Sequence, residues 1–245
     1  MAVARTARII ASAPAGERGR LLRLELPEGG ELGFTGGQYV IIDTGVPRDD
    51  GKRHKRAYSV ISPDTEQHTF SIVVYGLQGG PGSAALHRAE VGTELAFSGP
   101  WGSFLPDDSV LRRTLLVATD SGITATLGLL RGRAFAPQRA QVQLVWLSES
   151  PGAFLSPDAV QEEVRSHGGR FAHHCIPPPG HPERPDAVRL RVLEVARAQA
   201  PERVFLAGDG ALLHPLREAL LTCGVETSAI RLEAFFNNPA RKAPA

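Results

Sequence analysis

The spacing of apolar residues changes near Asp107 and Asp108, and this change constrains the fold more than any other feature of the chain. Up to about Pro106, short runs with β-type patterns are separated by glycine and proline. Such runs are typical of strands in a small antiparallel barrel. The sequence therefore predicts an N-terminal antiparallel β-barrel with strands at residues 21–26, 38–43, 56–60, 69–75 and 93–98.

The rest of the chain alternates strand-like apolar runs with segments of helical length. Repeated βαβ units form an open parallel sheet that binds ligands at the carboxyl ends of its strands. The proline-rich segment 176–186 is expected to be a loop at that edge. We expect a C-terminal five-stranded, Rossmann-like α/β domain with strands at 114–118, 142–147, 170–175, 203–207 and 230–235. The predicted organisation is a β-barrel domain at 1–108, an α/β domain at 109–236 and a tail at 237–245.

The composition narrows the class of protein. The chain has 245 residues, 42% of them hydrophobic, and a net charge of +1, which favours a globular protein and gives no global field for nucleic acid or a membrane surface. We find no apolar run of the ~20 residues that a membrane helix needs and no secretory leader, so a cytoplasmic location is expected. Cys175 and Cys223 are too few for an iron-sulfur cluster, and we expect two buried thiols without a role. His173 and His174 alternate across a strand, so no metal site is predicted.

Four sequence segments in the first half suit a flavin nucleotide. Arg56-Ala57-Tyr58-Ser59 lies on a predicted strand, SIVVY follows on the next strand, and the glycine-rich segments GGPGS and GPWGSF come after it. An arginine offers a planar charged fork to phosphate oxygens, and a tyrosine ring packs along a flat heterocycle. Taken alone, the segment Arg56–Ser59 also fits an amphipathic strand, and GGPGS also fits a generic turn.

The order and spacing of these motifs resemble those of the ferredoxin-NADP reductase superfamily, along nearly the whole chain. The resemblance implies bound FAD or FMN, and the two-domain length favours FAD. It also implies that Ser59 hydrogen-bonds the reactive edge of the flavin, and that Ser83 begins a helix whose free amides face the phosphates. The implied flavin-binding residues are Arg56, Ala57, Tyr58, Ser59, Val73, Val74, Tyr75, Gly80, Gly82 and Ser83.

The same resemblance implies a site for the pyrophosphate of NAD(P)H after the strand at 114–118. Asp120 replaces a family glycine there, and Ala125 replaces a proline. Asp120 either opposes the phosphates or caps the helix starting at Ser121, and we favour the cap. The implied nucleotide-binding residues are Thr119, Ser121, Gly122, Ile123, Thr124, Glu149, Gly208 and Asp209.

Two further positions bear on the nucleotide chemistry. Glu149 would accept ribose hydroxyls and favour NADH over NADPH, although a solvated loop glutamate is an equal alternative. Ala207 replaces the cysteine that relatives place near the nicotinamide, which should slow or retune hydride transfer.

At the C-terminus, the resemblance implies that Phe235 or Phe236 covers the flavin ring. Because neighbouring residues of a strand face opposite sides, one of the two is expected in the core. Ser59, Phe235 and Phe236 are therefore the catalytic candidates.

The resemblance implies a reductase that takes a hydride from NAD(P)H onto FAD and passes single electrons to a ferredoxin, flavodoxin or oxygenase component. Basic residues between Arg48 and Arg56 could steer an acidic ferredoxin, or could form a solvated loop in which only Arg56 serves the flavin. The alternative function is a flavin-binding electron relay or regulatory subunit with weakened nucleotide chemistry, favoured by Asp120, Ala125 and Ala207.

Overall fold

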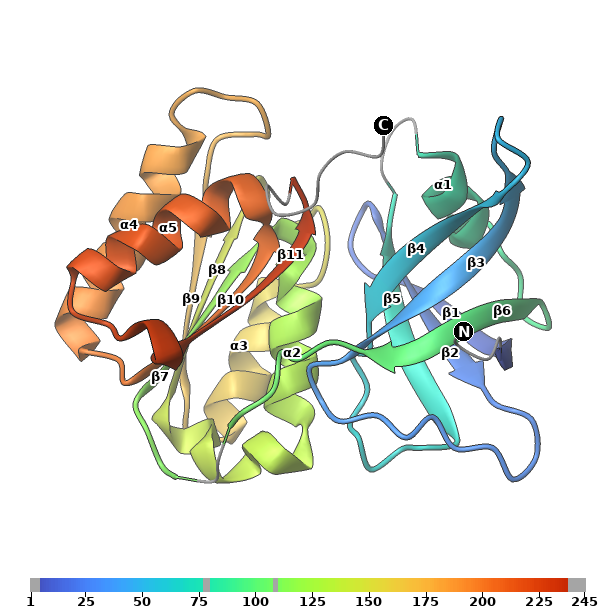
Figure 1. The fold of residues 1–245 in the computed structure, drawn as a ribbon, viewed down its shortest axis with the longest axis horizontal. Coiled ribbons are helices and arrows are strands. Elements are labelled where there is room, and N and C mark those ends of the chain that lie inside the picture. Colours follow the sequence, from blue (N-terminus) through green and yellow to red (C-terminus); the bar gives the residue numbers. More distant parts are fainter. Residues whose placement is uncertain (1–4, 77–79, 108–109, 238–245) are drawn as a thin grey trace. The chain divides into compact units, whose positions relative to one another are not determined.

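The computed structural model describes residues 5–76, 80–107 and 110–237 of the chain (Figure 1). These residues form two compact units, each of which is described by itself. Unit 1 comprises residues up to Leu105 together with Leu127–Phe135 and Gly152–Leu155, and unit 2 comprises the remaining segments. The predicted domain boundary at 108/109 and most of the predicted tail lie outside the described residues.

Unit 1 is built on a six-stranded antiparallel sheet in the order β4-β3-β6-β1-β2-β5. β4 and β5 are the two ends of this ladder, so the sheet is barrel-like but not closed. The Ile61 amide, just beyond β4, donates to the Ser71 carbonyl of β5 at 2.8 Å and links the two ends locally. The elements are β1 Arg5–Pro14, β2 Gly19–Glu25, β3 Tyr39–Pro47, β4 Arg53–Ser59, β5 Thr69–Tyr75, α1 Pro81–His87 and β6 Glu94–Trp101.

The core of unit 1 gathers the inward-facing residues of these strands. Alternate positions along β2 place Leu22 and Leu24 inside, and β5 contributes Phe70, Ile72 and Val74. Such two-residue alternation lets one face of a sheet bury its apolar side chains. β1 has no counterpart among the predicted strands, because most of its residues are small or polar and only Ala7 and Ile9 are buried in it.

Unit 2 is built on a five-stranded parallel sheet in the order β11-β10-β7-β8-β9. This is the predicted Rossmann-like α/β architecture, and every predicted strand of this half is present. The strands are β7 Thr114–Thr119, β8 Val142–Ser148, β9 Arg170–Cys175, β10 Arg203–Asp209 and β11 Ile230–Phe236. Its helices are α3 Pro157–Ser166, α4 Arg184–Gln199 and α5 Gly210–Thr222, with 3₁₀ turns at Asp120–Gly122 and Thr227–Ala229. Helix α2 Ile123–Arg131 and the 3₁₀ turn Arg133–Gln141 are divided between the units, because Leu127–Phe135 belongs to unit 1.

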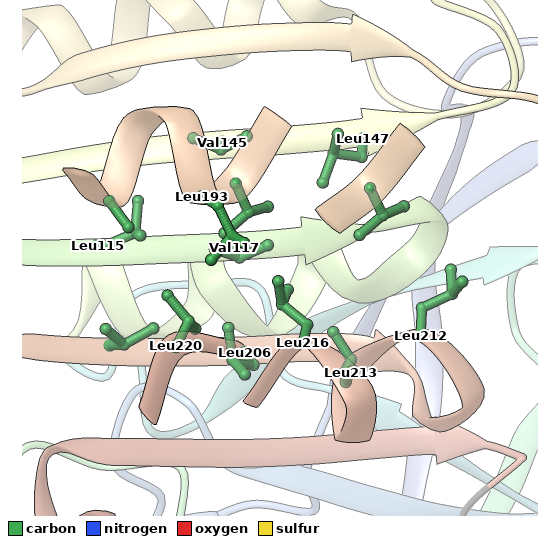
Figure 2. Packing of buried hydrophobic residues seen from close by; sticks show 14 of the residues in the cluster. Leu115, Val117, Val145, Leu147, Leu193, Leu206, Leu212, Leu213, Leu216 and Leu220 are labelled. Atoms are coloured by element: carbon green, nitrogen blue, oxygen red, sulfur yellow. The ribbon is translucent and has the colours of Figure 1, made fainter. Parts of the chain in front are cut away.

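One face of this sheet carries the larger core of unit 2. Leu212, Leu213, Leu216 and Leu220 of α5 meet the sheet beside Leu206, as Figure 2 shows. The i, i+3, i+4 spacing places these four leucines on one stripe of the helix. α4 covers the neighbouring part of the same face with Val188, Val192 and Leu193, which pack on β7 and β8 through Leu115, Val117, Val145 and Leu147.

Three predictions from the sequence are wrong in detail. Helix α1 begins at Pro81 rather than Ser83, because proline is pre-organised for the first helical position. The predicted loop 176–186 ends early, since α4 begins at Arg184 with Pro185 in its first turn. Cys175 and Cys223 are exposed free thiols, not buried ones. Among the described residues, no helix is long and apolar enough to cross a membrane.

Candidate cofactor and nucleotide sites

The candidate flavin site of unit 1 lies on the edge strand β4. His54, Arg56 and Tyr58 are half-buried on one face of the strand, whereas Arg53, Lys55 and Ala57 are exposed on the other. The Arg56 guanidinium donates to the Lys55 carbonyl at 2.9 Å. Because side chains alternate along the strand, the Ala57 side chain points to the face opposite Arg56 and Tyr58, and only the Ala57 backbone lies between them.

Helix α1 packs its first turn against the same face of β4. A Cβ atom added to Gly82 would lie 3.1 Å from Thr44 Cγ2 and 3.2 Å from His54 Cβ, so a larger residue would require these side chains to shift by a few tenths of an ångström. The Ser83 hydroxyl donates to the Gly80 carbonyl at 3.0 Å. The amides of Gly82 and Ser83 have no carbonyl four residues earlier within the helix, so they remain able to donate to an anion.

Ser59, the last residue of β4, is buried at 4% exposure. Its Oγ has no hydrogen-bond partner among the residues that the structure describes. A buried hydroxyl without a partner costs about 1–3 kcal/mol, which a ligand with a polar edge would recover. Burial raises the pKa of the neighbouring Tyr58 phenol to about 12, while Arg56 opposes the shift, so the phenol keeps its proton. These groups fit a flat polar ring with a phosphate chain.

The remaining predicted flavin residues have structural roles of their own. Val73 and Val74 of β5 are buried, and Val74 belongs to the core. The Tyr75 ring packs edge-on against Phe154 at 5.3 Å, and the Tyr75 hydroxyl accepts from Arg18 at 3.3 Å. Gly80 is the half-buried residue before α1, and its carbonyl also accepts from the Ala84 amide at 2.9 Å. Gly79 lies outside the described residues.

The candidate nucleotide site of unit 2 lies where the strand order reverses. β7 and β10 are neighbours in the sheet. The chain continues from β7 to β8 towards one edge of the sheet, and from β10 to β11 towards the other edge. In open α/β sheets, ligands bind beside such a switch point at the carboxyl ends of the strands. The segment after β7 carries the predicted residues Ser121, Gly122, Ile123 and Thr124, and β10 ends in Gly208 and Asp209.

The two loops at this switch point are packed directly on each other. A Cβ atom on Gly122 would lie 2.1 Å from the Ala207 carbonyl oxygen, and one on Gly208 would lie 2.2 Å from Thr119 Oγ1. Gly208 also has a φ of +131°, which side chains rarely adopt. The Thr119 hydroxyl accepts from the Asp209 amide at 2.9 Å and joins β7 to β10.

The polar side chains at this edge are largely occupied by internal contacts. The Thr124 hydroxyl donates to the Ser121 carbonyl at 2.9 Å. Asp209 caps α5, because its Oδ1 accepts from the Ala211 amide at 3.0 Å, and the same oxygen accepts from Asn237 Nδ2 at 3.0 Å. Ile123 is buried, Ser121 is half-buried and Glu149 is exposed.

Asp120 does not have the capping role predicted for it. Its carboxylate pairs with the buried guanidinium of Arg184 at the start of α4, and its backbone carbonyl accepts from Trp146 Nε1 at 2.9 Å. Thr119 precedes the 3₁₀ turn at Asp120, and its side chain makes no capping bond. Sequence reasoning missed Arg184 because its partner lies 64 residues away, and only its place in the proline-rich loop marked it.

At the C-terminal end of β11, Phe235 is half-buried and Phe236 is 44% exposed. Neither ring is fully buried, so the expectation that one belongs to the core is wrong. Burial raises the pKa of the nearby Glu233 carboxyl to about 7. Among the described residues, no three acidic, histidine or cysteine side chains are grouped as a metal site.

Comparison with known proteins identifies the family. Residues 7–105 match the family model described as the oxidoreductase FAD-binding domain. The chain is 34% identical over 239 residues to ferredoxin-NADP reductase B of Sorangium cellulosum, an alignment that covers 94% of this chain and 96% of that protein. The chain belongs to the ferredoxin-NADP reductase superfamily of FAD- and NAD(P)-binding oxidoreductases. The resemblance drawn from the sequence motifs is thereby confirmed.

Two further proteins are similar over nearly the whole chain. The reductase component 1 of terephthalate 1,2-dioxygenase from Comamonas sp is 29% identical, covering 96% of this chain and 69% of that protein. A crystal structure of a ferredoxin NADP+ reductase from Neisseria gonorrhoeae, with bound FAD and NADP, has a TM-score of 0.77 at 20% identity. That comparison covers 96% of this chain and 100% of the other, and it establishes the shared two-part fold.

Proposed function

We propose that this oxidoreductase takes a hydride from NAD(P)H onto bound FAD and passes single electrons to a ferredoxin, flavodoxin or oxygenase component. The observation that carries the proposal is the buried Ser59 hydroxyl, which lacks a hydrogen-bond partner among the described residues at the end of the Arg56–Tyr58 strand. A structural serine would be satisfied within the fold, so the hydroxyl is explained best by a bound group.

The residues of unit 1 suit the separate parts of FAD. Arg56 and the first-turn amides of Gly82 and Ser83 would bind the phosphates, and Tyr58 would lie along the ring system. The Ser59 hydroxyl would donate to the reactive edge of the ring. Bound FAD supplies the capacity to accept two electrons as a hydride and to release them one at a time.

The residues of unit 2 suit a dinucleotide at the switch point between β7 and β10. The loop Ser121–Thr124 would bind the pyrophosphate through its backbone. Gly208, packed directly on Thr119, would hold the end of β10 beside this loop. The exposed Glu149 would accept the ribose hydroxyls and disfavour an added phosphate, so we propose NADH as the preferred donor. Phe235 or Phe236 would cover the flavin ring until the nicotinamide arrives.

The proposed electron acceptor follows from the relatives and from the β3–β4 hairpin. Relatives include a ferredoxin-NADP reductase and a dioxygenase reductase component. On the hairpin, Arg48 pairs with Asp50 at 3.4 Å and Arg53 with Asp43 at 3.9 Å, which reduces the local charge. Lys52 and Lys55 remain exposed on the hairpin. These two lysines would attract an acidic one-electron carrier.

An anaerobic titration tests the proposal. The purified protein is reconstituted with FAD, and the flavin absorbance is followed while NADH and NADPH are added separately. Rapid bleaching by at least one nucleotide is the expected result, with NADH the more effective. FAD binding without bleaching by either nucleotide would favour the electron-relay alternative, to which Ala125 and Ala207 point. Failure to bind FAD at all would overturn both functions.

A further inference from the structure

An arginine buried beside the nucleotide loop has no role in the function proposed above. Arg184 is 3% exposed, and its guanidinium donates to the Pro177 carbonyl and pairs with the Asp120 carboxylate. Its Nε lies buried without a hydrogen-bond acceptor among the described residues. Burying a charged side chain in this way is costly, and apolar replacements of buried ion pairs are often equally stable or more stable. A contribution to packing alone therefore does not explain the arginine.

The partner of Arg184 stands at the first position of the nucleotide loop. Asp120 follows β7 directly and has a φ of +49°, the left-handed region that favours glycine. Two side chains hold it there. Trp146 donates to its carbonyl at 2.9 Å, and Arg184 pairs with its carboxylate. The Trp146 ring is itself packed on His173, with centroids 5.0 Å apart. The Asp120 backbone is therefore held by a contact from β8, and its carboxylate by a contact from the start of α4.

The charges around Asp120 would oppose a bound anion if they were not balanced. Burial raises the pKa of the Asp120 carboxyl, Arg184 opposes that shift, and Asp209 and Glu149 add to it. Three carboxyl groups thus act on one another at the edge where the strands end. A nucleotide pyrophosphate carries two further negative charges, and like charges within a few ångströms disfavour binding.

We propose that Arg184 is a positioning residue that makes the nucleotide loop competent for pyrophosphate by neutralising the Asp120 carboxylate and turning it away from the loop amides. This inference rests on the proposed binding of NAD(P)H at the β7–β10 switch point. It explains how an aspartate is tolerated at a position whose backbone lies in the left-handed region that favours glycine. The same inference assigns a function to the proline-rich segment before α4, which fixes the guanidinium through the Pro177 carbonyl.

The test measures ligand affinity rather than turnover, on the FAD-loaded protein. ADP carries a pyrophosphate without nicotinamide, and adenosine carries neither, so calorimetric titration with both isolates the phosphate contribution. In Arg184→Met, the Asp120 charge is uncompensated, and the dissociation constant for ADP should rise at least ~10-fold. In Asp120→Asn, the arginine is released toward the ligand, and the dissociation constant should fall or stay unchanged. Adenosine binding should change in neither variant.

Two more variants complete the design. The double variant Asp120→Asn/Arg184→Met removes both charges and should bind ADP within ~3-fold of the unsubstituted protein. Arg184→Lys keeps the positive charge and should recover most of the affinity lost in Arg184→Met. Thermal unfolding and FAD absorbance verify that each variant is folded and loaded.

The outcomes are distinguishable. Weaker ADP binding in Arg184→Met together with unchanged or tighter binding in Asp120→Asn, and recovery in the double variant, would support the inference. Equal weakening by both single substitutions, or unchanged ADP binding in folded Arg184→Met, would overturn it while leaving nucleotide binding intact. If the unsubstituted protein binds neither ADP nor NAD(P)H, the proposed function itself is wrong.

Discussion

At the scale of single residues, the loops of unit 2 depend on glycines that leave no room for a side chain. Gly208 combines a φ of +131° with an approach to the backbone and hydroxyl of Thr119. Thr119 in turn accepts from the amide of Asp209, so the contact joins two neighbouring strands at the switch point. Gly208 is therefore required for the fold of the candidate site itself, independently of any ligand.

Gly208→Ala should therefore lower the free energy of unfolding by about 3 kcal/mol or more, since it adds both strain and a clash. Gly224→Ala is the matched control, because Gly224 has a φ of +90° with open space around it. That control should cost only about 1 kcal/mol. Urea unfolding of the three proteins measures the difference, and equal losses in both variants would show that the close approach to Thr119 contributes nothing.

Glu233 provides a second prediction at this scale. Burial raises the pKa of its carboxyl from 4.5 to about 7, so the folded protein holds this proton while the unfolded chain releases it. The unsubstituted protein should lose stability relative to Glu233→Gln as the pH rises from about 4.5 to about 7, and the difference should stay constant above that range. Unfolding measured across pH 4–8 checks this. A difference that does not depend on pH would contradict the raised pKa.

At the scale of elements, strand β4 separates two functions by its two faces. Arg56 and Tyr58 are half-buried on one face, and Lys55 is exposed on the other. The side chains of adjacent residues in a strand point to opposite faces of the sheet, whereas their backbones belong to the same strand. Neighbouring substitutions on β4 can therefore distinguish a side-chain contact with FAD from a general disturbance of the strand.

Arg56→Ala should weaken FAD binding at least ~10-fold, because it removes a charge paired with phosphate. Lys55→Ala, one residue away on the opposite face, should leave FAD binding unchanged. Fluorescence titration of the flavin-free proteins with FAD measures both constants. Equal retention of FAD by the two variants would remove Arg56 from the proposed site.

The elements themselves were largely predictable from the sequence. β5 and β9 have the predicted bounds, and the other predicted strands differ from the observed ones by at most four residues at either end, because alternating or continuous apolar runs record burial directly. β1 was missed because alanine and arginine at its positions carry little strand signal. The Asp120–Arg184 pair and the Asn237–Asp209 hydrogen bond could not be predicted, since each joins residues that only the tertiary fold brings together.

At the scale of the whole molecule, the net charge of +1 provides no long-range attraction for an acidic partner. Any steering must come from local charge, and the β3–β4 hairpin carries exposed Lys52 and Lys55. Interactions between exposed charges are screened beyond ~8–10 Å at physiological salt. The proposed partner preference should therefore be sensitive to ionic strength.

Lys55→Glu should lower the rate of electron transfer to an acidic ferredoxin several-fold at low salt. The effect should fade near about 0.5 M salt, because salt screens the interaction of an exposed charge with the partner. Reduction of the bound flavin by NADH, which does not involve the acceptor, should be unaffected. Arg189→Glu, the same change of charge on the exposed face of α4, serves as the control. Stopped-flow traces at several salt concentrations provide the comparison. A loss that persists at high salt would argue against steering by the hairpin.

The two compact units are interleaved along the chain rather than consecutive. Unit 1 takes in Leu127–Phe135, whose Arg133 amide donates to Asp64, and Gly152–Leu155, whose Phe154 ring packs on Tyr75. During synthesis the ribosome must therefore deliver more than half of the polypeptide before the N-terminal unit can complete its own contacts. Unit 1 can therefore complete its folding only after residue 155 has been synthesised, and not when its last strand is finished. A gene truncated after residue 105 would encode a unit 1 that lacks part of its packing.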